Sequence, residues 1–200
     1  AIFVFGVPFP WIIICAAIVG HLGGRLAPAL FALGGGHGTA KGGAAPALID
    51  DDTPTPAHAL FTWTRVALVT TCGLVLWLVP MAMLTVTWGW EHTLSQMAWF
   101  FTKAALLTFG GAYAVLPYVY QGGVEQYHWL SATQMIDGLA LGETTPGPLI
   151  MVVTFIGFVG GWTKQLFGPD SLAAAGIVAG MVVTYFTFLP SFIMIFLGAP

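Results

Sequence analysis

The charged residues of this chain separate long stretches that contain none. Five such stretches are at least 20 residues long: 1–24, 66–90, 104–124, 144–163 and 171–200. A helix that crosses a lipid bilayer needs about 20 consecutive, mainly apolar residues. The apolar runs in and around these stretches predict membrane helices over residues 2–20, 66–88, 97–120, 131–142, 146–162 and 171–198. The first of these contains Pro8 and Pro10.

Composition and tryptophan placement both indicate a membrane protein. Hydrophobic residues make up 58% and charged residues 6% of the chain, against about 25% charged residues in soluble domains. So few charges argue against a soluble enzyme or a disordered chain, and the lack of a basic stripe argues against nucleic acid as a partner. Six tryptophans lie near predicted helix ends, where such rings settle at the lipid headgroups: Trp63, Trp88, Trp90, Trp99, Trp129 and Trp162. The sequence predicts an all-α, polytopic transmembrane helical bundle in a lipid bilayer.

Residues 34–59 differ from the rest because they are rich in Gly, Ala and Pro and include three consecutive aspartates. We interpret them as part of a flexible extramembrane linker. Arg25, Lys41 and Arg65 lie in or beside it, and this excess of basic residues places it in the cytoplasm. The chain begins and stops within apolar runs, so we expect an excerpt of a longer protein. Its expected parts are the last helix region of a first membrane half, a cytoplasmic linker and most of a truncated second half, over residues 1–24, 25–62 and 63–200.

Lys103 is an ionisable residue within a predicted membrane helix. Such residues are functional candidates because a charge inside a bilayer is costly. Residues seven apart share a helix face, so Gln96, Lys103 and Gly110 form one stripe with Gly111 beside it. Glycines let another helix approach closely, which favours a Lys103 that faces the bundle. A lysine that snorkels to the nearby headgroups fits equally well, and both interpretations stay open.

Residues 142–148, Gly-Glu-Thr-Thr-Pro-Gly-Pro, predict a helix break inside an apolar region. Proline cannot continue the preceding helix but suits the first turn of the next one. Non-helical backbone survives at membrane depth only inside protein or around a wet cavity, and such broken helices build substrate sites in secondary transporters. We place the break at residues 146–148, with Thr144 and Thr145 as hydrogen-bond donors. A simple interfacial turn between two helices is the alternative.

Two carboxylates precede this break. Glu143 stands directly before it and Asp137 lies six residues earlier, which is about 240° around a helix, so the two do not share a face. Burial raises the pKa of a carboxyl toward neutrality, so a buried carboxylate here is a candidate proton carrier. Exposed loop carboxylates without such a role are the alternative, more so for Asp137.

Other patterns concern packing and the absence of catalytic chemistry. Glycine pairs spaced four apart predict close helix packing, at Gly138/Gly142, Gly157/Gly161 and Gly176/Gly180. The five histidines show no metal-ligand spacing, the two cysteines lie far apart within apolar runs, and no nucleophile arrangement is visible. We therefore expect no metal, no cofactor and no enzyme activity.

Three stretches together resemble the chromate ion transporter family, in its long form with two homologous membrane halves. FTKAALLTFGGAYAVLPYV (101–119) resembles the family's Lys…Phe-Gly-Gly…Pro helix. MIDGLALGETTPGPLIMVVTFIGF (135–158) resembles its Pro-Gly-Pro segment, and FTFLPSFIMIFLGAP (186–200) resembles its late helix. The acidic tract at residues 51–58 resembles the linker between the halves.

The resemblance implies a multi-pass secondary transporter that exports chromate from the bacterial cytoplasm across the inner membrane. Sulfate is implied as a competing oxyanion, with coupling to protons or to the membrane potential, and a homo-oligomer is compatible with it. Together with the helix break, the resemblance gives these candidates for substrate binding: Lys103, Gly110, Gly111, Thr144, Thr145 and Gly147. The candidates for proton coupling are Glu143 and Asp137. The helix break itself is assigned to Pro146 and Pro148.

Three other functions stay open at this stage. The first is a transporter whose physiological substrate is sulfate or another anion, with chromate transported incidentally. A structural membrane subunit is the second, and it would tolerate substitution of Lys103 and residues 143–148 as long as packing survives. An intramembrane enzyme is the third, and it would need a nucleophile or metal constellation that the sequence does not show.

Overall fold

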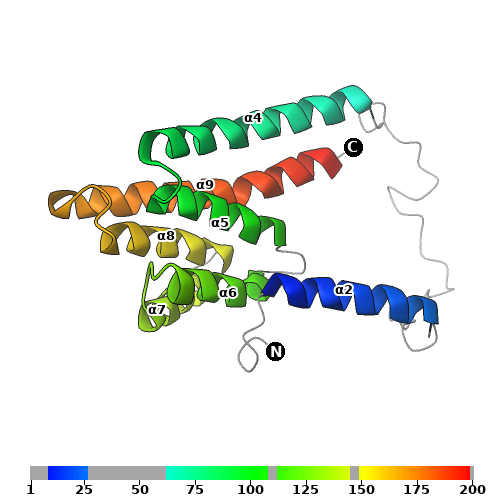
Figure 1. The fold of residues 1–200 in the computed structure, drawn as a ribbon, viewed down its shortest axis with the longest axis horizontal. Coiled ribbons are helices and arrows are strands. Elements are labelled where there is room, and N and C mark those ends of the chain that lie inside the picture. Colours follow the sequence, from blue (N-terminus) through cyan, green and yellow to red (C-terminus); the bar gives the residue numbers. More distant parts are fainter. Residues whose placement is uncertain (1–8, 27–61, 108–111, 145–148, 199–200) are drawn as a thin grey trace, which may run out of the picture. The chain divides into compact units, whose positions relative to one another are not determined.

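The computed structural model describes residues 9–26, 62–107, 112–144 and 149–198. These residues form helices and turns and no strand, which confirms the all-α prediction for this part of the chain (Figure 1). The elements in chain order are α2 (Phe9–Leu26), α4 (Trp63–Trp88), α5 (Thr93–Leu107), α6 (Ala112–Tyr120), η2 (Gln121–Gln126), α7 (Ala132–Thr144), η3 (Leu149–Met151), α8 (Val152–Thr163), η4 (Pro169–Ser171) and α9 (Leu172–Gly198).

The chain divides into two compact units, Ala1–Leu60 and Phe61–Pro200. The helix described in the first unit is α2, and it continues to Leu26, so the predicted end at residue 20 was wrong. Pro10 lies in the first turn of α2, where the missing N–H of a proline costs no helical hydrogen bond. Pro8 lies outside the described residues. The second unit contains all the other described helices.

Two helices of the second unit are long and apolar enough to cross a membrane. α4 has 26 residues, and η4 with α9 has 30. At 1.5 Å per residue, 26 residues reach about 39 Å, which exceeds the roughly 30 Å hydrocarbon core of a bilayer. The two helices pack antiparallel, because Tyr185 Oη donates to the Leu76 carbonyl oxygen at 2.7 Å while Ile193 lies against Gly73. Both helices agree closely with the predicted spans.

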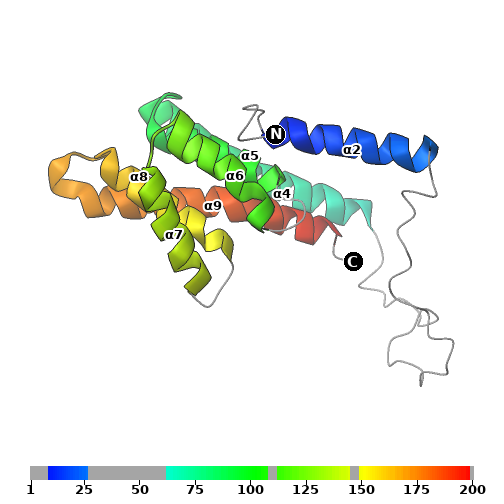
Figure 2. The same cartoon turned by 90° about the horizontal axis from the view of Figure 1, so that it is seen from below.

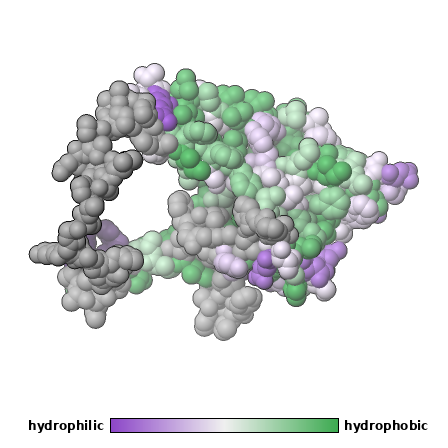
Figure 3. Space-filling model, turned by 180° about the vertical axis from the view of Figure 1, so that it is seen from behind, coloured by the Kyte–Doolittle hydropathy of each residue, from purple (hydrophilic) through white to green (hydrophobic). Residues whose placement is uncertain are grey.

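Much of the surface of the second unit is apolar. On α4 alone, the exposed fractions of Leu68, Val79 and Val86 are 63%, 61% and 87%. Figure 3 shows hydrophobic residues over much of the visible described surface, with the most hydrophilic residues toward its edges. Apolar surface on this scale is typical of a helix that faces lipid or another protein.

The helices between α4 and α9 form two antiparallel hairpins, one of α5 and α6 and one of α7 and α8 (Figures 1 and 2). In the first, Phe100 in the middle of α5 stacks on Tyr118 near the end of α6, with ring centroids 4.7 Å apart. In the second, α7 packs against both η3 and α8. The chain therefore advances and returns twice before α9 begins.

The first hairpin corrects one prediction. Residues 97–120 were expected to form one continuous helix, but α5 ends at Leu107 and α6 begins at Ala112 and runs in the opposite direction. The connection contains Gly110 and Gly111, which lie outside the described residues. Glycine is about 1 kcal/mol less favourable than alanine inside a helix, so a Gly-Gly pair is a position where a helix ends at low cost.

The core of the second unit forms where α5 and α8 pack on α9. Glycines bring α8 and α9 together: a Cβ on Gly157 would lie 2.9 Å from the Ala179 carbonyl oxygen, and one on Gly176 would lie 3.0 Å from the Phe158 carbonyl oxygen. Gly161 is equally confined by the Ala175 backbone. The predicted close packing at the glycine pairs of α8 and α9 is therefore confirmed.

Trp129 is a core residue and not an interfacial one. It is 1% exposed and lies between Tyr127, Phe100 and Phe101, at ring-centroid distances of 4.7, 5.4 and 6.0 Å. The expectation that it sits among headgroups was wrong, because the short connection that carries it folds back over the middle of α5. By contrast, Trp88, Trp90 and Trp162 are exposed near helix ends.

Candidate functional site

Lys103 lies on α5 and is half-buried. Its Nζ is 5.7 Å from the centroid of the Trp99 ring, one turn nearer the start of the helix. Because α5 begins at Thr93, the Lys103 Cα lies about 15 Å along the helix at 1.5 Å per residue. Lys103 therefore lies farther from the start of its helix than the predicted start at residue 97 indicated, and its ammonium lies over the Trp99 ring.

The returning arm of the first hairpin packs against the start of the returning arm of the second. α6 packs against η3, so the start of the return at Ala112 and the start at Leu149 belong to neighbouring segments. The N-terminus of a helix carries partial positive charge and unpaired N–H groups, which favour anions. Six of the predicted site residues belong to the connections before these starts and lie outside the described residues: Gly110, Gly111, Thr145, Pro146, Gly147 and Pro148.

The other predicted site residues lie at the surface of α7. Asp137, Glu143 and Thr144 are exposed. The Thr144 hydroxyl donates to the Ala140 carbonyl oxygen at 2.9 Å, so it is not the free donor that the sequence suggested. Among the described residues, no ion pair or hydrogen bond joins Lys103 to these three side chains. α7 ends at Thr144, two residues beyond the predicted helix end at residue 142 and just before the predicted break at residues 146–148.

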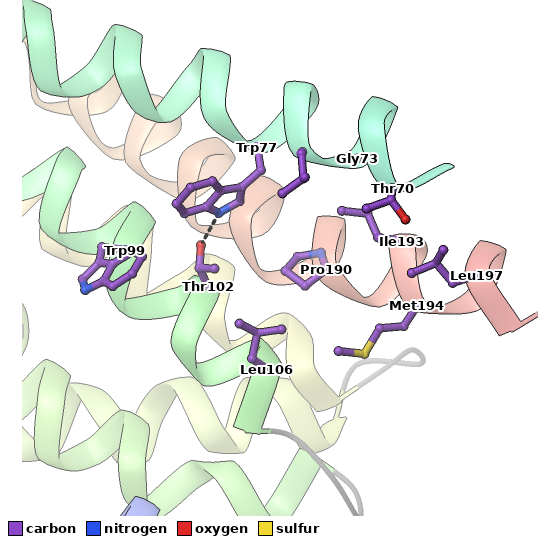
Figure 4. A pocket seen from close by; sticks show the side chains of 11 residues that line it. Thr70, Gly73, Trp77, Trp99, Thr102, Leu106, Pro190, Ile193, Met194 and Leu197 are labelled. Atoms are coloured by element: carbon purple, nitrogen blue, oxygen red, sulfur yellow. Dashed lines mark hydrogen bonds between the residues drawn. The ribbon is translucent and has the colours of Figure 1, made fainter. Parts of the chain in front are cut away.

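A cavity of about 370 Å³ opens between α4, α5 and α9 (Figure 4). Trp77 Nε1 donates to Thr102 Oγ1 at 3.0 Å, and Thr102 Oγ1 donates to the Ala98 carbonyl oxygen at 2.8 Å. The rest of the lining is almost entirely apolar, with Leu106 and Pro190 facing inward (Figure 4). Since its polar pair is satisfied internally, this cavity suits hydrocarbon and offers no charge to an oxyanion.

A second cavity, of about 540 Å³, lies along α8 and α9. Thr184 Oγ1 donates to the Gly180 carbonyl oxygen, and Thr154 Oγ1 lies 2.7 Å from Thr184 Oγ1. Thr154 is therefore the donor of that pair, and both hydroxyl protons are used within the protein. This groove also lacks a charged side chain.

Sequence reasoning did not single out Trp77 or Thr102, although both line the first cavity. Trp77 carried the available signal, because it lies in the middle of a predicted span and away from the helix ends where tryptophan is usual. Its N–H needs a partner at that depth, and Thr102 supplies it across 25 residues of sequence. No local pattern reveals that pairing.

Comparison with known proteins identifies relatives of this chain by sequence. The sequence model of the family described as Chromate transporter matches residues 95–200. A chromate transport protein from Cupriavidus metallidurans is 36% identical over 107 residues, which are 54% of this chain and 23% of that protein. A chromate transport protein from Pseudomonas aeruginosa is 36% identical over 131 residues, which are 64% of this chain and 28% of that protein.

An uncharacterized transporter from Bacillus subtilis is 38% identical over 81 residues, which are 36% of this chain and 46% of that protein. The matched part of the chain spans about a quarter of the length of the chromate transport proteins above. No solved structure matches the chain.

Proposed function

The chain belongs to the chromate transporter family, and on this basis we propose that it forms part of a secondary transporter that exports chromate across the bacterial inner membrane. The observation that carries the proposal is a family match that covers nearly all of α5 and every later described helix. In this proposal α4 and α9 cross the bilayer within a polytopic helical bundle. The linker before α4 lies in the cytoplasm, because Arg25, Lys41 and Arg65 accompany it.

We place the anion site where the two hairpins turn. Lys103 lies one turn before the end of α5, and in this proposal the N-terminal ends of the arms that begin at Ala112 and Leu149 face the same region. The packing of α6 against η3 supports this. Broken helices in other secondary transporters offer such ends to anionic groups. The Gly110–Gly111 connection and the Thr145–Pro148 connection would bring backbone N–H groups and a hydroxyl close to the substrate.

The ammonium of Lys103 would have to leave the Trp99 ring to reach this site. A cation over an aromatic ring is held by about 0.5–1 kcal/mol at an exposed position, and a lysine stem has four flexible carbons. A tetrahedral dianion attracts the ammonium more strongly than the ring does, because full charges interact. The aromatic contact is therefore a resting position that the substrate displaces.

The proposal is tested first by chromate accumulation in cells that express the full parent gene, compared with an empty vector. We expect lower accumulation with the gene, and its restoration when the membrane potential is dissipated. Excess sulfate that restores accumulation supports a shared oxyanion site. Unchanged accumulation with confirmed membrane expression moves the function to sulfate or another anion.

Substitution of Lys103 tests the anion site. Lys103→Gln is expected to reduce chromate export at least about tenfold, because a buried charge–charge contact of more than about 1.4 kcal/mol is lost. Lys103→Arg keeps the charge and is expected to retain part of the activity. Lys164→Gln, at an exposed lysine after α8, is the matched control and should export normally. Wild-type export by both Lys103→Gln and Lys103→Ala would leave Lys103 as a snorkelling residue.

We keep Glu143 as the proposed proton carrier although its side chain is exposed on α7, because a carboxylate that stays negative beside an anion site would oppose binding. Glu143→Gln is expected to flatten the pH dependence of chromate export measured in vesicles. Glu125→Gln, at an exposed glutamate in η2, is the control. A Glu143→Gln profile that matches the wild type removes the proton-carrier role of Glu143 and leaves Asp137 as the other candidate.

A further inference from the structure

Three connections of the second unit lie at the same end of it. They are residues 89–92 between α4 and α5, residues 127–131 between η2 and α7, and residues 164–168 after α8. Figures 1 and 2 both place these connections together, at the end opposite the start of α4 and the end of α9. We call this end the loop face.

Side-chain contacts fix the depth of the second connection relative to the first. Phe100 lies only about 10 Å along α5 from its start at 1.5 Å per residue. Its ring centroid is 5.9 Å from that of Tyr127 and 5.4 Å from that of Trp129. Burial, and next the charge of Glu91, raise the pKa of Tyr127. The connection at residues 127–131 therefore lies beside the connection that contains Glu91.

The end of α8 reaches the same level. Gly160 is three residues before the end of that helix, and it lies against Met97 near the start of α5. A Cβ on Gly160 would lie 3.1 Å from the Trp129 Cβ. All three connections consequently meet around Trp129, within one or two helical turns of one another.

The helices of the hairpins are too short to reach the opposite surface of a bilayer. α5 and α7 have 15 and 13 residues, and the returning arms, α6 with η2 and η3 with α8, run over residues 112–126 and 149–163, which are 15 residues each. At 1.5 Å per residue the longest of them reaches about 22 Å, against a core of roughly 30 Å. A continuous crossing by residues 97–120 would put residues 127–131 on the other side of the bilayer from Glu91, which the contacts of Phe100 and Trp129 contradict.

We propose that α5–η2 and α7–α8 are re-entrant hairpins, and that the loop face is a single surface that docks at the lipid headgroups of one leaflet. The partner is the headgroup layer, because the exposed residues of the loop face combine aromatic rings with charges. Trp88, Trp90 and Trp162 are 43%, 49% and 43% exposed, and Glu91, Glu125 and Lys164 are exposed beside or within it. Rings of this kind prefer the boundary between hydrocarbon and water.

Cysteine labelling in the full-length protein tests the topology. All native cysteines, Cys15 and Cys72 included, are replaced, and single cysteines are introduced as Glu91→Cys, Glu125→Cys, Lys164→Cys and Thr64→Cys. A membrane-impermeant maleimide is applied to intact cells and to inverted vesicles, and labelling after detergent lysis normalises each variant. We expect the first three positions to react from one side and position 64 from the other.

One labelling result would contradict the proposed topology. Reaction of Glu125→Cys from the side opposite to Glu91→Cys would overturn the proposal, because it requires a full crossing between them. If Glu125→Cys fails to insert, Gln126→Cys, at the neighbouring exposed residue, gives the same comparison. These outcomes do not depend on which anion is transported, so the topology can fail while the proposed function stands, and the reverse.

A spin label tests the docking at headgroups. A spin label at Trp90→Cys is expected to lie at the interface, where collisions with dissolved oxygen and with an aqueous nickel complex increase its relaxation rate to comparable extents. Leu78→Cys, at an exposed residue in the middle of α4, is the control and should respond to oxygen alone. An increase in the relaxation rate of the Trp90→Cys label by nickel alone would place the loop face in water and overturn the docking.

Discussion

Gly157 on α8 lies where the backbones of α8 and α9 approach each other closely. A Cβ there would lie 2.9 Å from the Ala179 carbonyl oxygen and 3.0 Å from the Gly180 Cα, and neither backbone atom can turn aside. Gly157→Ala is therefore expected to lower the free energy of unfolding by about 1–3 kcal/mol through overpacking. Thermal unfolding in detergent micelles measures it. Gly20→Ala, where nothing lies within 4 Å, is the control and should not destabilise.

His92 gives the stability a dependence on pH. The Leu94 N–H donates to its Nδ1 at 3.3 Å, and burial lowers the pKa of His92 from its ordinary value of 6.5. The unfolded chain therefore binds the proton more tightly than the folded one. Stability is fully present above pH 6.5 and declines as the pH falls toward the lowered folded pKa.

Replacement of His92 should remove this dependence. His92→Gln is expected to reduce the loss of thermal stability between about pH 7.5 and about pH 5, measured in the same micelles. His128→Gln is the control for the removal of a histidine, because its side chain is exposed. An unchanged pH profile for His92→Gln would show that other groups cause the acid loss.

At the scale of elements, Trp129 connects both hairpins. It packs on Phe100 and Phe101 of α5 and against Gly160 of α8, although it belongs to neither helix. Trp129→Ala is expected to cost about 3–5 kcal/mol of stability, as for other large core side chains. Trp129→Phe should cost less because it keeps a ring in place. Trp162→Ala, with a side chain 43% exposed, is the control, and a similar loss in both variants would contradict the central position of Trp129.

The elements also show which parts of the fold a local pattern determines. α4 has Arg65 in its first turn and ends shortly before Glu91, and α9 follows Asp170; the rest of each helix is mainly apolar. Length and hydropathy alone therefore predicted both helices within a few residues. The run 97–120 has the length of a membrane span as well. Its reversal depends on Phe100 meeting Tyr118 and Trp129, which are contacts between residues far apart in sequence, so hydropathy did not reveal it.

The candidate site follows the same division. Lys103 was identifiable because a charge within an apolar run is conspicuous by itself. The distance of Lys103 from the start of its helix could not be predicted correctly, because the helix begins four residues earlier than expected. Thr144 was predicted as a free donor from residue type alone, yet its hydroxyl is bonded to the carbonyl of the preceding turn. Which hydroxyls are free depends on where a helix stops, and helix ends are the least certain part of such a prediction.

At the scale of the whole molecule, the two proposals divide the second unit by task. α4 and α9 give it length across the bilayer, while the hairpins bring two chain reversals to intermediate depth. Relatives of this chain are about four times as long as the matched segment, by the shares of 23% and 28% that it covers. The exposed apolar surface of α4 is therefore available both to lipid and to the remainder of such a protein.

The packing of α5 and α8 on α9 also has a consequence for biogenesis. The ribosome makes α9 after both hairpins, so the hairpins leave it before the helix that covers them exists. Neither hairpin contains a segment long enough for stable insertion by itself. The nascent chain must therefore hold four short apolar helices unassembled until α9 enters the membrane, and during that interval their uncovered faces are substrates for chaperones and proteases.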